Sequence, residues 1–262
     1  MAFDTHAHLD LPQFDVDRES VIERALDAGV GIINTIGIDV GASHKAVGLA
    51  DRYPFIFASV GIHPQEAGKA ERKDIDELAK LAKHPRVIAI GELGLDFYHG
   101  NAPREAQLKV LNWELELAKK VGLPIIIHCR EAQKYLLPVI QDWVASHPSP
   151  ESKRKGVLHC FSADLPTAEE YLKMGFFIAL GAYIGYPSSK ALRGTINSIP
   201  LDRMVVETDC PFLPPQKFRG RRNEPSYMLD TLTILAEIKG LSLEEMSGCT
   251  TQNAKELFHI ST

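Results

Sequence analysis

The sequence has few cysteines, and their spacing gives no sign of a bridged or paired-thiol framework. Cys129, Cys160, Cys210 and Cys249 show no CxxC spacing. No apolar secretory segment follows Met1, and no apolar run approaches the roughly 18 residues of a membrane-spanning helix. These absences argue against a disulfide-stapled secreted protein and against a membrane protein, so we expect a reduced, cytoplasmic chain.

Positive charge is not in excess either. The 262 residues carry a net charge of −5, so no overall basic field points to nucleic acid, although a local basic loop or bound cations could supply the attraction. With 45% hydrophobic and 24% charged residues, the composition is that of a globular protein. Length alone allows one large domain or two small ones, since α/β barrels of about 250 residues form single domains.

No residue-level repeat stands out and no linker divides the chain, but its architecture alternates. Short apolar runs alternate with amphipathic helical segments. The predicted strands are Ala2–Thr5, Gly31–Ile38, Ile56–Ile62, Val87–Leu93, Pro124–His128, Gly156–Phe161, Phe176–Leu180 and Met204–Thr208. The predicted helices are Arg18–Ala28, Gly41–Arg52, Glu71–Lys83, Arg104–Val121, Glu131–Ser146, Leu165–Met174, Ser188–Ser198 and Ser226–Lys239. Ser146–Lys155 is interpreted as a loop before the sixth strand.

The predicted strands are those of a parallel sheet covered on both faces. Several, such as Pro124–Ile127, are apolar almost throughout, as buried parallel strands are. Eight β/α units in about 250 residues predict an α/β fold, a closed (β/α)8 or TIM barrel with residues 1–262 as a single domain. An open doubly wound sheet would be expected to carry a glycine-rich phosphate loop after its first strand, where Asp4–Asp10 (DTHAHLD) stands instead.

Polar side chains gather at the ends of these strands, where a (β/α)8 barrel places its functional residues. They are His6 and His8 at the first strand, His63 at the third, Glu92 and Asp96 at the fourth, His128 and Arg130 at the fifth, His159 in the sixth, and Glu207 and Asp209 at the eighth. A lone histidine at such a place is more often a packed or capping residue. A set that converges on one rim is different, because burying so many unpaired imidazoles and carboxylates would be costly.

Divalent metal ions would remove that cost, since they take imidazole nitrogen and carboxylate oxygen as ligands. Residues i and i+2 of a strand point to one side, so His6 and His8 can bind one ion. Six candidate ligands suit two ions better than one, with Glu92 as the best bridging carboxylate. The six are His6, His8, Glu92, His128, His159 and Asp209. Asp209 could instead orient or deprotonate a water. Zinc, manganese and cobalt tolerate histidine-rich sets, whereas magnesium prefers oxygen; the metal stays open among these four.

Seven motifs then occur in order between positions 4 and 227: DTHAHLD, GIHP, GELGLDF, IIIHCR, LHCFS, ETDCPFLPP and FRGRRNEPSY. This ordered set closely resembles the TatD-type deoxyribonucleases, metal-dependent hydrolases with a TIM-barrel fold within the amidohydrolase-like superfamily. The resemblance implies 3′–5′ exonuclease action on DNA, and in some members also on RNA. The implied activity is a metal-dependent phosphodiesterase acting on DNA, single-stranded or at 3′ ends. Separately from the resemblance, we expect a monomer with no membrane partner.

The resemblance also implies a role for each matched residue. Asp209, in ETDCPFL, corresponds to the acid that binds metal and activates water, and His63, in GIHP, to a phosphate-facing histidine. Glu92, in GELGLD, corresponds to the bridging ligand. These three are the implied catalytic residues. The implied terminal ligands are His6 and His8 for the first metal and His128 and His159 for the second.

Substrate contacts are expected around this centre. Loops after the last strands often bind phosphate in this fold, and arginine forks two hydrogen bonds onto it, so we interpret Arg219, Arg221 and Arg222 as phosphate contacts rather than as a solvated basic loop. Arg130 is expected to hold substrate phosphate or to pair with Glu207. Tyr98 is expected to stack on a base. Phe97 is expected to pack in the barrel, whereas Tyr183 and Tyr186 could either pack or stack on bases. Glu207 could support a ligating histidine. The thiols of Cys129, Cys160 and Cys210 should point away from the ligands.

Two other functions stay open. One is hydrolysis of a carboxamide or lactone in a small molecule, as in other amidohydrolase-like barrels. Several of those bridge their metals with a carboxylated lysine, whereas here the bridging position falls to Glu92. The other is a barrel that keeps its ligands but acts as a binding module without activity.

Overall fold

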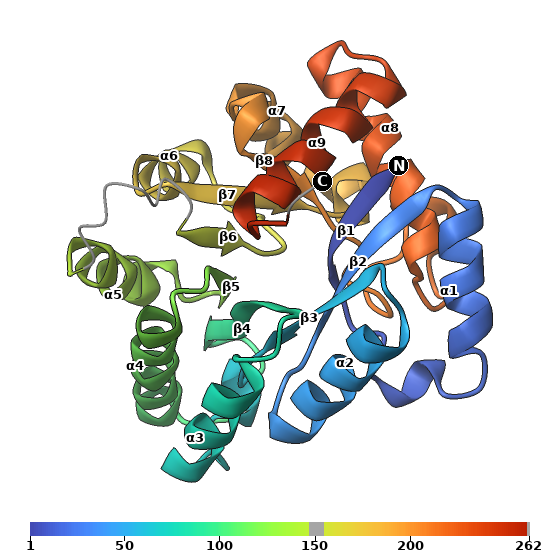
Figure 1. Cartoon of the computed structure of the whole chain (residues 1–262). Coiled ribbons are helices and arrows are strands. Elements are labelled where there is room, and N and C mark those ends of the chain that lie inside the picture. The colour runs from blue at the N-terminus through green and yellow to red at the C-terminus, as the bar shows by residue number, and fades with distance from the viewer. Residues whose placement is uncertain (147–154, 261–262) are drawn as a thin grey trace.

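Eight parallel strands in the order β1 to β8 form one sheet that is nearly closed into a barrel, with helices packed around it (Figure 1). The computed structural model describes residues 1–146 and 155–260. The strands are β1 (Ala2–Ala7), β2 (Val30–Ile36), β3 (Ile56–Val60), β4 (Val87–Asp96), β5 (Ile125–Arg130), β6 (Gly156–Leu158), β7 (Phe176–Leu180) and β8 (Met204–Val206). The predicted α/β barrel is therefore confirmed.

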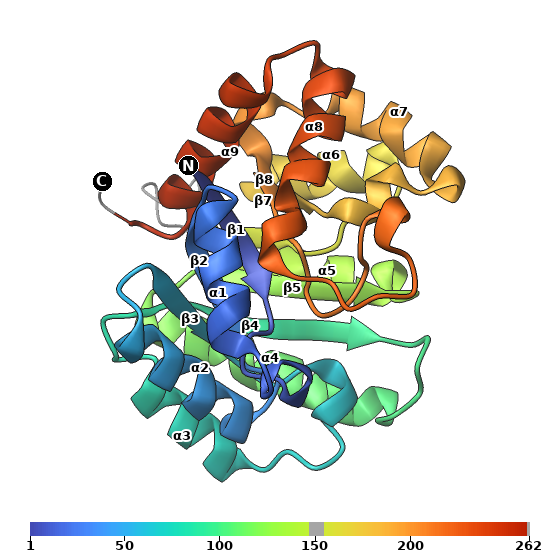
Figure 2. The same cartoon turned by 90° about the vertical axis from the view of Figure 1, so that its right-hand side faces the viewer.

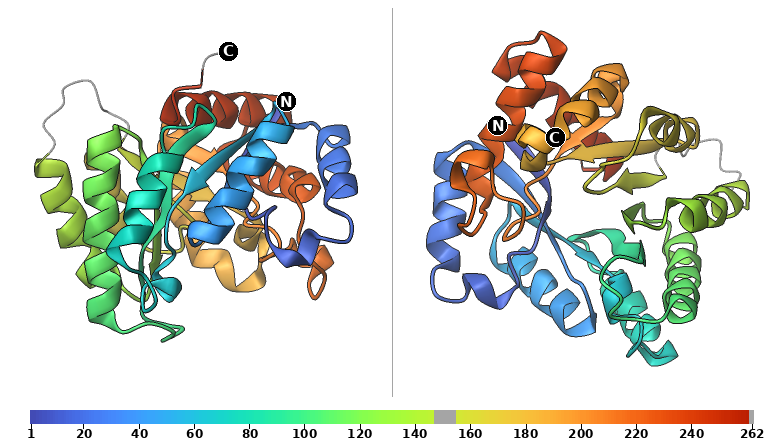
Figure 3. Two further views of the ribbon diagram at one scale, coloured as in Figure 1. Left: turned by 60° about the horizontal axis from the view of Figure 1, so that its bottom comes forward. Right: turned by 180° about the vertical axis from the view of Figure 1, so that it is seen from behind.

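The helices follow the strands along the chain and surround them, as two further views show (Figure 3). They are α1 (Arg18–Asp27), α2 (Val40–Arg52), α3 (Arg72–Leu81), α4 (Arg104–Val121), α5 (Gln133–Ala145), α6 (Leu165–Lys173), α7 (Lys190–Ser198), α8 (Met228–Lys239) and α9 (Leu243–Leu257). Across the described part of the chain, none of these helices has both the length and the apolar character needed to cross a membrane. Residues 147–154 of the expected loop before β6 lie outside the described residues.

Hydrogen bonds around one isolated bridge join the ends of β1 and β8. Ala7 and Cys210 form an isolated parallel bridge. The amide of Asp209 donates to the carbonyl of His6 (2.8 Å), and the amide of His8 donates to the carbonyl of Cys210 (2.8 Å). The first and last strands are thereby joined where they carry His6, His8 and Asp209.

Helix α9 covers the opposite end of the barrel. Alternate strand residues form an apolar layer with α9 residues; it contains Phe3, Ile32, Ile88, Ile126, Val157, Phe177, Val205, Ala254, Leu257 and Phe258. The rings of Phe3 and Phe258 lie 5.8 Å apart. Helix α9 was not among the predicted helices, although Ser242 and Glu245 form a capping box that marks its start. With one end sealed by apolar packing, the polar strand ends are left for the other end.

Candidate metal centre

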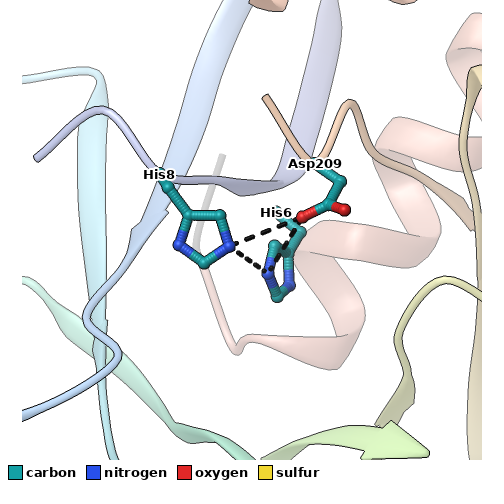
Figure 4. A group of neighbouring side chains, drawn as sticks. All are labelled: His6, His8 and Asp209. Atoms are coloured by element: carbon teal, nitrogen blue, oxygen red, sulfur yellow. Dashed lines mark hydrogen bonds and ion pairs between the residues drawn. The ribbon is translucent and has the colours of Figure 1, made fainter. Parts of the chain in front are cut away.

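His6 and His8 turn their imidazole rings toward Asp209 at the closed seam of the barrel (Figure 4). Their Nε2 atoms lie 3.2 Å apart, and Asp209 Oδ1 lies 3.9 Å from His6 Nε2 and 3.4 Å from His8 Nε2. Two ligands of one tetrahedral ion, each about 2.0–2.1 Å from the metal, are roughly 3.3–3.4 Å apart. These three atoms are therefore spaced like donors around a common cation.

A bulge in β1 aims the two histidines into the barrel mouth. Asp4 pairs with Ile33 on β2, but Ala7 pairs with Thr35, so three steps along β1 match two along β2. Phe3 belongs to the interior apolar layer, and strict alternation would turn His6 to the other face of the strand. Because a bulge re-aims the side chains that follow it, His6 and His8 face the mouth.

Glu92, on β4, faces two groups of imidazoles with its two carboxylate oxygens. Oε2 lies 3.3 Å from His6 Nε2 and 3.8 Å from His8 Nε2. Oε1 lies 2.7 Å from His128 Nδ1 and 3.7 Å from His159 Nε2. Each oxygen thus points at a different set of nitrogen donors, which is the arrangement of a carboxylate that bridges two cations.

The second group of imidazoles comes from β3, β5 and β6. His63, Glu92 and His128 form one set whose possible ligand atoms lie within 4.8 Å of one another. His63 Nε2 lies 3.4 Å from His128 Nδ1 and 3.7 Å from Glu92 Oε1. His159 lies between the two groups, because its ring stacks on that of His6 at 3.6 Å while its Nε2 is 3.7 Å from Asp209 Oδ1. The seven predicted metal-site and catalytic residues therefore meet in one place.

Hydrogen bonds on the far side of three rings determine which nitrogen each ring turns inward. Glu207 Oε2 lies 2.8 Å from His159 Nδ1, and Asp96 Oδ2 lies 3.2 Å from His128 Nε2. The carbonyl of Ile36 lies 3.0 Å from His8 Nδ1. Such outer partners fix the tautomer and orientation of ligating histidines. Support of a ligating histidine was expected of Glu207, whereas no partner was predicted for Asp96.

Burial and neighbouring charges together set the protonation of the centre. Burial lowers the pKa of His6, and it lowers the pKa of His63 to about 3. Burial also disfavours the charged form of His8, but Asp209 and Glu92 outweigh it and raise the pKa of His8 to about 9. Burial disfavours ionised Glu92 as well, yet the surrounding histidines hold its pKa well below the usual range. The centre therefore combines an ionised carboxylate with closely packed imidazoles.

This donor set fits divalent cations. Five imidazoles and two carboxylates converge with no lysine or arginine among them. Their nitrogen and oxygen atoms face one another across distances that ligands of a shared ion adopt, and imidazole with carboxylate suits zinc, manganese or cobalt. Within the described residues, His6 Nδ1 is buried without a hydrogen-bond partner.

A cavity of about 420 Å³ opens onto this centre. Its lining includes predicted ligands and substrate contacts together with residues for which no role was predicted. The missed lining residues are Leu11, Ile38, Gln65, Glu66, His99, Phe212 and Leu213. Two of them have a visible link to the site, since Asp96 Oδ2 accepts from Gln65 Nε2 (3.1 Å) and lies 2.7 Å from His99 Nδ1. The sequence held one clue to them: Gln65 directly follows the GIHP motif, and His99 lies two residues after GELGLDF.

Cys160 also lines the cavity, which corrects the expectation that its thiol points away. Alternation does not apply to it, because β6 ends at Leu158 and Cys160 has a left-handed backbone conformation (φ 47°). Its sulfur lies within 4.8 Å of ligand atoms of His159 and Asp209. Cys210 is buried in the core, as expected of a packing thiol.

The predicted substrate-binding residues separate into two groups. Of those described, His63 and Arg130 line the cavity, whereas Tyr98, Arg219 and Arg221 lie outside its lining. Both oxygens of Glu207 are engaged, one by His159 and one by the amide of Cys160 (2.7 Å), so Glu207 does not serve as the carboxylate partner considered for Arg130.

The expectation that Arg222 contacts phosphate is wrong, because its guanidinium is paired within the protein. Its Nη1 and Nη2 atoms each donate to an oxygen of Asp17 at 2.7 Å, and its guanidinium lies over the ring of Phe14. A fork already satisfied by a carboxylate is not available to a phosphate. The sequence leaves base stacking open for Tyr183 and Tyr186. Tyr183 is buried, and the guanidinium of Arg219 already lies over the ring of Tyr186 at 4.4 Å.

The family model described as "TatD related DNase" matches residues 3–259. The chain belongs to this TatD family. The match covers almost the whole chain, and it includes every residue of the centre. It confirms the predicted family and, with it, the predicted class of metal-dependent hydrolase and nuclease.

Relatives within the TatD family are similar over their full length. The uncharacterised metal-dependent hydrolase YabD of Bacillus subtilis is 39% identical over 261 residues, which is 100% of both chains. The 3′-5′ ssDNA/RNA exonuclease TatD of Erwinia tasmaniensis is 34% identical over 264 residues, covering 98% of this chain and 100% of the relative. The crystal structure of the TatD homologue YjjV of Escherichia coli superposes with a TM-score of 0.91 at 30% identity, covering 99% of this chain and 98% of that one.

Proposed function

We propose that the protein is a two-metal phosphodiesterase that removes nucleotides from the 3′ end of single-stranded DNA. The observation that supports it most strongly is Glu92, whose two oxygens face separate groups of imidazoles at the base of a cavity. Membership of the TatD family supports the same chemistry. We also propose that residues 1–262 act as one barrel and as a monomer. The four free cysteines support a reducing, cytoplasmic location.

The proposed ligands divide between two ions. His6, His8 and Asp209 would hold one, His128 and His159 the other, and Glu92 would bridge them. Bound divalent cations would supply Lewis-acid polarisation of the scissile phosphodiester and lower the pKa of a water molecule. The ions are zinc, manganese, cobalt or magnesium, with the histidine-rich set favouring the first three.

His63 is placed to donate a hydrogen bond to a phosphoryl oxygen. The amide of Gln65 donates to His63 Nδ1 (3.2 Å), so that nitrogen carries no proton. A neutral ring then carries its proton on Nε2, which faces the cavity and the Glu92–His128 pair. A protonated nitrogen is a donor and cannot bind a metal, which supports a phosphate contact for His63 rather than a seventh ligand.

Asp209 and Arg130 complete the proposed site. Asp209 directs Oδ1 at the imidazoles of His6, His8 and His159, which leaves Oδ2 to accept a proton from the attacking water. Burial disfavours the ionised form of Asp209, but these histidines outweigh burial and lower the pKa of the carboxyl group. The carboxylate is therefore ionised and able to act as a base. Arg130 lines the same cavity and can bind a phosphate oxygen through its guanidinium.

The proposal is tested by elemental analysis of the purified protein beside assays on 5′-labelled and 3′-labelled DNA, single- and double-stranded. We expect about two divalent ions per chain and a ladder of 5′-labelled products shortened from the 3′ end. A panel of lactones and carboxamides run in parallel checks the alternative hydrolase reaction. Hydrolysis of a lactone with no action on any DNA would overturn the proposal, and metal without any hydrolysis would favour a binding module.

A further inference from the structure

Aromatic rings and arginines are paired beside the cavity, where β4 and β5 end. The β4–β5 rim is defined here as Phe97, Tyr98, Arg104, Arg130 and Tyr135. Phe97 and Tyr98 follow β4, Arg130 ends β5, Arg104 begins α4, and Tyr135 lies in the first turn of α5. All five therefore lie on the face of the barrel that carries the candidate metal centre. Figure 2 shows the arrows of β4 and β5 pointing to the same side of the molecule.

The rim contains two stacked units. In the first, the guanidinium carbon of Arg130 lies 4.5 Å from the centre of the Tyr98 ring. In the second, the guanidinium carbon of Arg104 lies 4.3 Å from the Phe97 ring and 5.6 Å from the Tyr135 ring, and those two rings meet edge to face at 5.3 Å. The units are adjacent, because the amide of Phe97 donates to the carbonyl of Arg130 (3.0 Å).

Exposure and charge distinguish this rim from the other arginine–aromatic pairs. Tyr98 and Tyr135 are 57% and 47% exposed. Within residues 1–146 and 155–260, neither Arg104 nor Arg130 has a carboxylate within ion-pair distance. By contrast, the stacked arginines Arg52, Arg72 and Arg222 each pair with one, Glu19, Glu116 and Asp17 respectively. Arg86 and Arg219 also have no such carboxylate within these residue ranges, but the rings of their partners, Phe57 and Tyr186, are only partly exposed. The rim thus presents exposed rings beside cationic groups that no protein anion neutralises.

Arg130 connects this rim to the cavity, because it lines the cavity and stacks on Tyr98. A cavity of about 420 Å³ is of small-molecule size, so most of a polynucleotide must lie outside it. An exposed ring accepts any base by stacking, and a guanidinium held flat against a ring keeps its N–H groups directed outward for phosphate. These are the two requirements for binding a single strand without sequence preference.

We propose that the β4–β5 rim binds the nucleotides upstream of the one in the cavity, with bases on Tyr98 and Tyr135 and phosphates on Arg130 and Arg104. This inference rests on the proposed phosphodiesterase function and adds a route for the strand. The strand leaves the cavity past Arg130 and crosses the first turns of α4 and α5. Single-stranded nucleic acid is the fitting partner, since a paired duplex would bury the faces of its bases.

The test uses full-length Tyr135→Ala, Arg104→Gln and Tyr135→Phe proteins, none of which alters a proposed ligand or a cavity residue. Binding of fluorescein-labelled oligothymidylates of increasing length is measured by anisotropy. Hydrolysis of the same strands and of bis(4-nitrophenyl) phosphate is measured after loading with manganese. We expect Tyr135→Ala to weaken binding of long strands about 5- to 150-fold, with no change for the small diester. Tyr135→Phe should bind as the parent does, because stacking needs the ring and not the hydroxyl.

Arg52→Ala is the matched control, since Arg52 also stacks on a tyrosine but ends α2 on the opposite face of the barrel. Circular dichroism checks that each variant is folded. Unchanged binding of long strands by folded Tyr135→Ala and Arg104→Gln would overturn the route, as would an equal loss on the small diester. If Arg219→Ala alone weakened long strands, the strand would cross the β8–α8 loop instead. Failure of the parent protein to cleave any phosphodiester would instead refute the proposed function, while anisotropy would still test the rim.

Discussion

Glu207 Oε2 lies 2.8 Å from His159 Nδ1, and both residues are almost completely buried. The other oxygen of Glu207 accepts from the amide of Cys160. The carboxylate therefore anchors the start of the loop after β6 and holds the His159 ring with Nε2 toward Glu92 and Asp209. A residue outside the group of candidate ligands thus sets the orientation of one inside it.

This contact predicts the effect of Glu207→Gln. The amide keeps nearly the same shape but loses the negative charge that makes the His159 imidazole a better donor, so metal affinity should fall about 10- to 100-fold. Affinity is measured by competition with a chromophoric chelator. Glu244→Gln, at an exposed position on α9, is the control and should leave affinity unchanged. Equal affinities for Glu207→Gln and the parent would show that the carboxylate has no such role.

Arg221 is exposed and makes no side-chain ion pair within the described residues, so it can contact substrate phosphate. We expect Arg221→Ala to weaken binding of single-stranded DNA and to reduce the slope of log affinity against log salt by about 0.7, the value for one phosphate contact. Metal content should not change. An unaltered salt slope would count against a phosphate contact at this position.

Arg222, its neighbour, should behave differently because it ties the loop after β8 to Asp17. Arg222→Ala removes a forked, partly buried ion pair, and we expect the free energy of unfolding to fall by about 1–2 kcal/mol. Denaturant unfolding measures this loss, with Arg221→Ala as the matched control. A larger effect of Arg222→Ala on the salt slope than on stability would contradict this assignment.

Glu114 predicts an unusual pH dependence of stability. It is buried on α4, accepts from the amide of Ile62 (2.7 Å) through Oε1, and has no partner for Oε2 within the described residues. Burial raises its pKa well above the ordinary value of 4.5. The folded protein therefore binds this proton more tightly than the unfolded chain does. The resulting stabilisation is complete below pH 4.5 and is lost as pH rises toward the folded pKa.

Glu114→Gln removes this titration while keeping an acceptor for Ile62. Relative to the parent, the variant should gain stability as pH rises above about 4.5, by about 1.4 kcal/mol per pH unit until the folded pKa is reached. Denaturant unfolding of both proteins at several pH values between about 5 and 8 gives the difference directly. A difference that stays constant with pH would show that Glu114 is ionised in the folded protein.

Much of the fold and the composition of the site could be predicted from the sequence, because both depend on local patterns. Apolar runs alternating with amphipathic segments predicted the eight strands that the sheet contains. In a parallel barrel all strand ends meet at one rim, so His6, Glu92 and Asp209 could be brought together without knowing any distance. The spacing of His6 and His8 predicted a shared site, and their Nε2 atoms lie 3.2 Å apart.

The remaining features depend on contacts between distant residues or on local backbone shape. Arg222 and Asp17 are 205 positions apart, and no sequence pattern in either segment predicts that they pair. The contact of Asp96 with His128 depends on how β4 and β5 are aligned. Cys160 could not be placed by alternation because the strand ends two residues earlier. Strand periodicity identifies the face of a side chain only while the chain stays in a regular strand without a bulge.

The metal content of the parent protein and of Glu92→Ala tests whether Glu92 holds two cations. Glu92 is the residue whose two oxygens face both groups of imidazoles, so its removal should release both ions and abolish nearly all hydrolysis. Both proteins are reconstituted with manganese, desalted and measured by elemental analysis, with thermal unfolding to confirm that the variant is folded. We expect about two ions per chain in the parent and almost none in folded Glu92→Ala. Two ions retained by the variant would contradict this expectation.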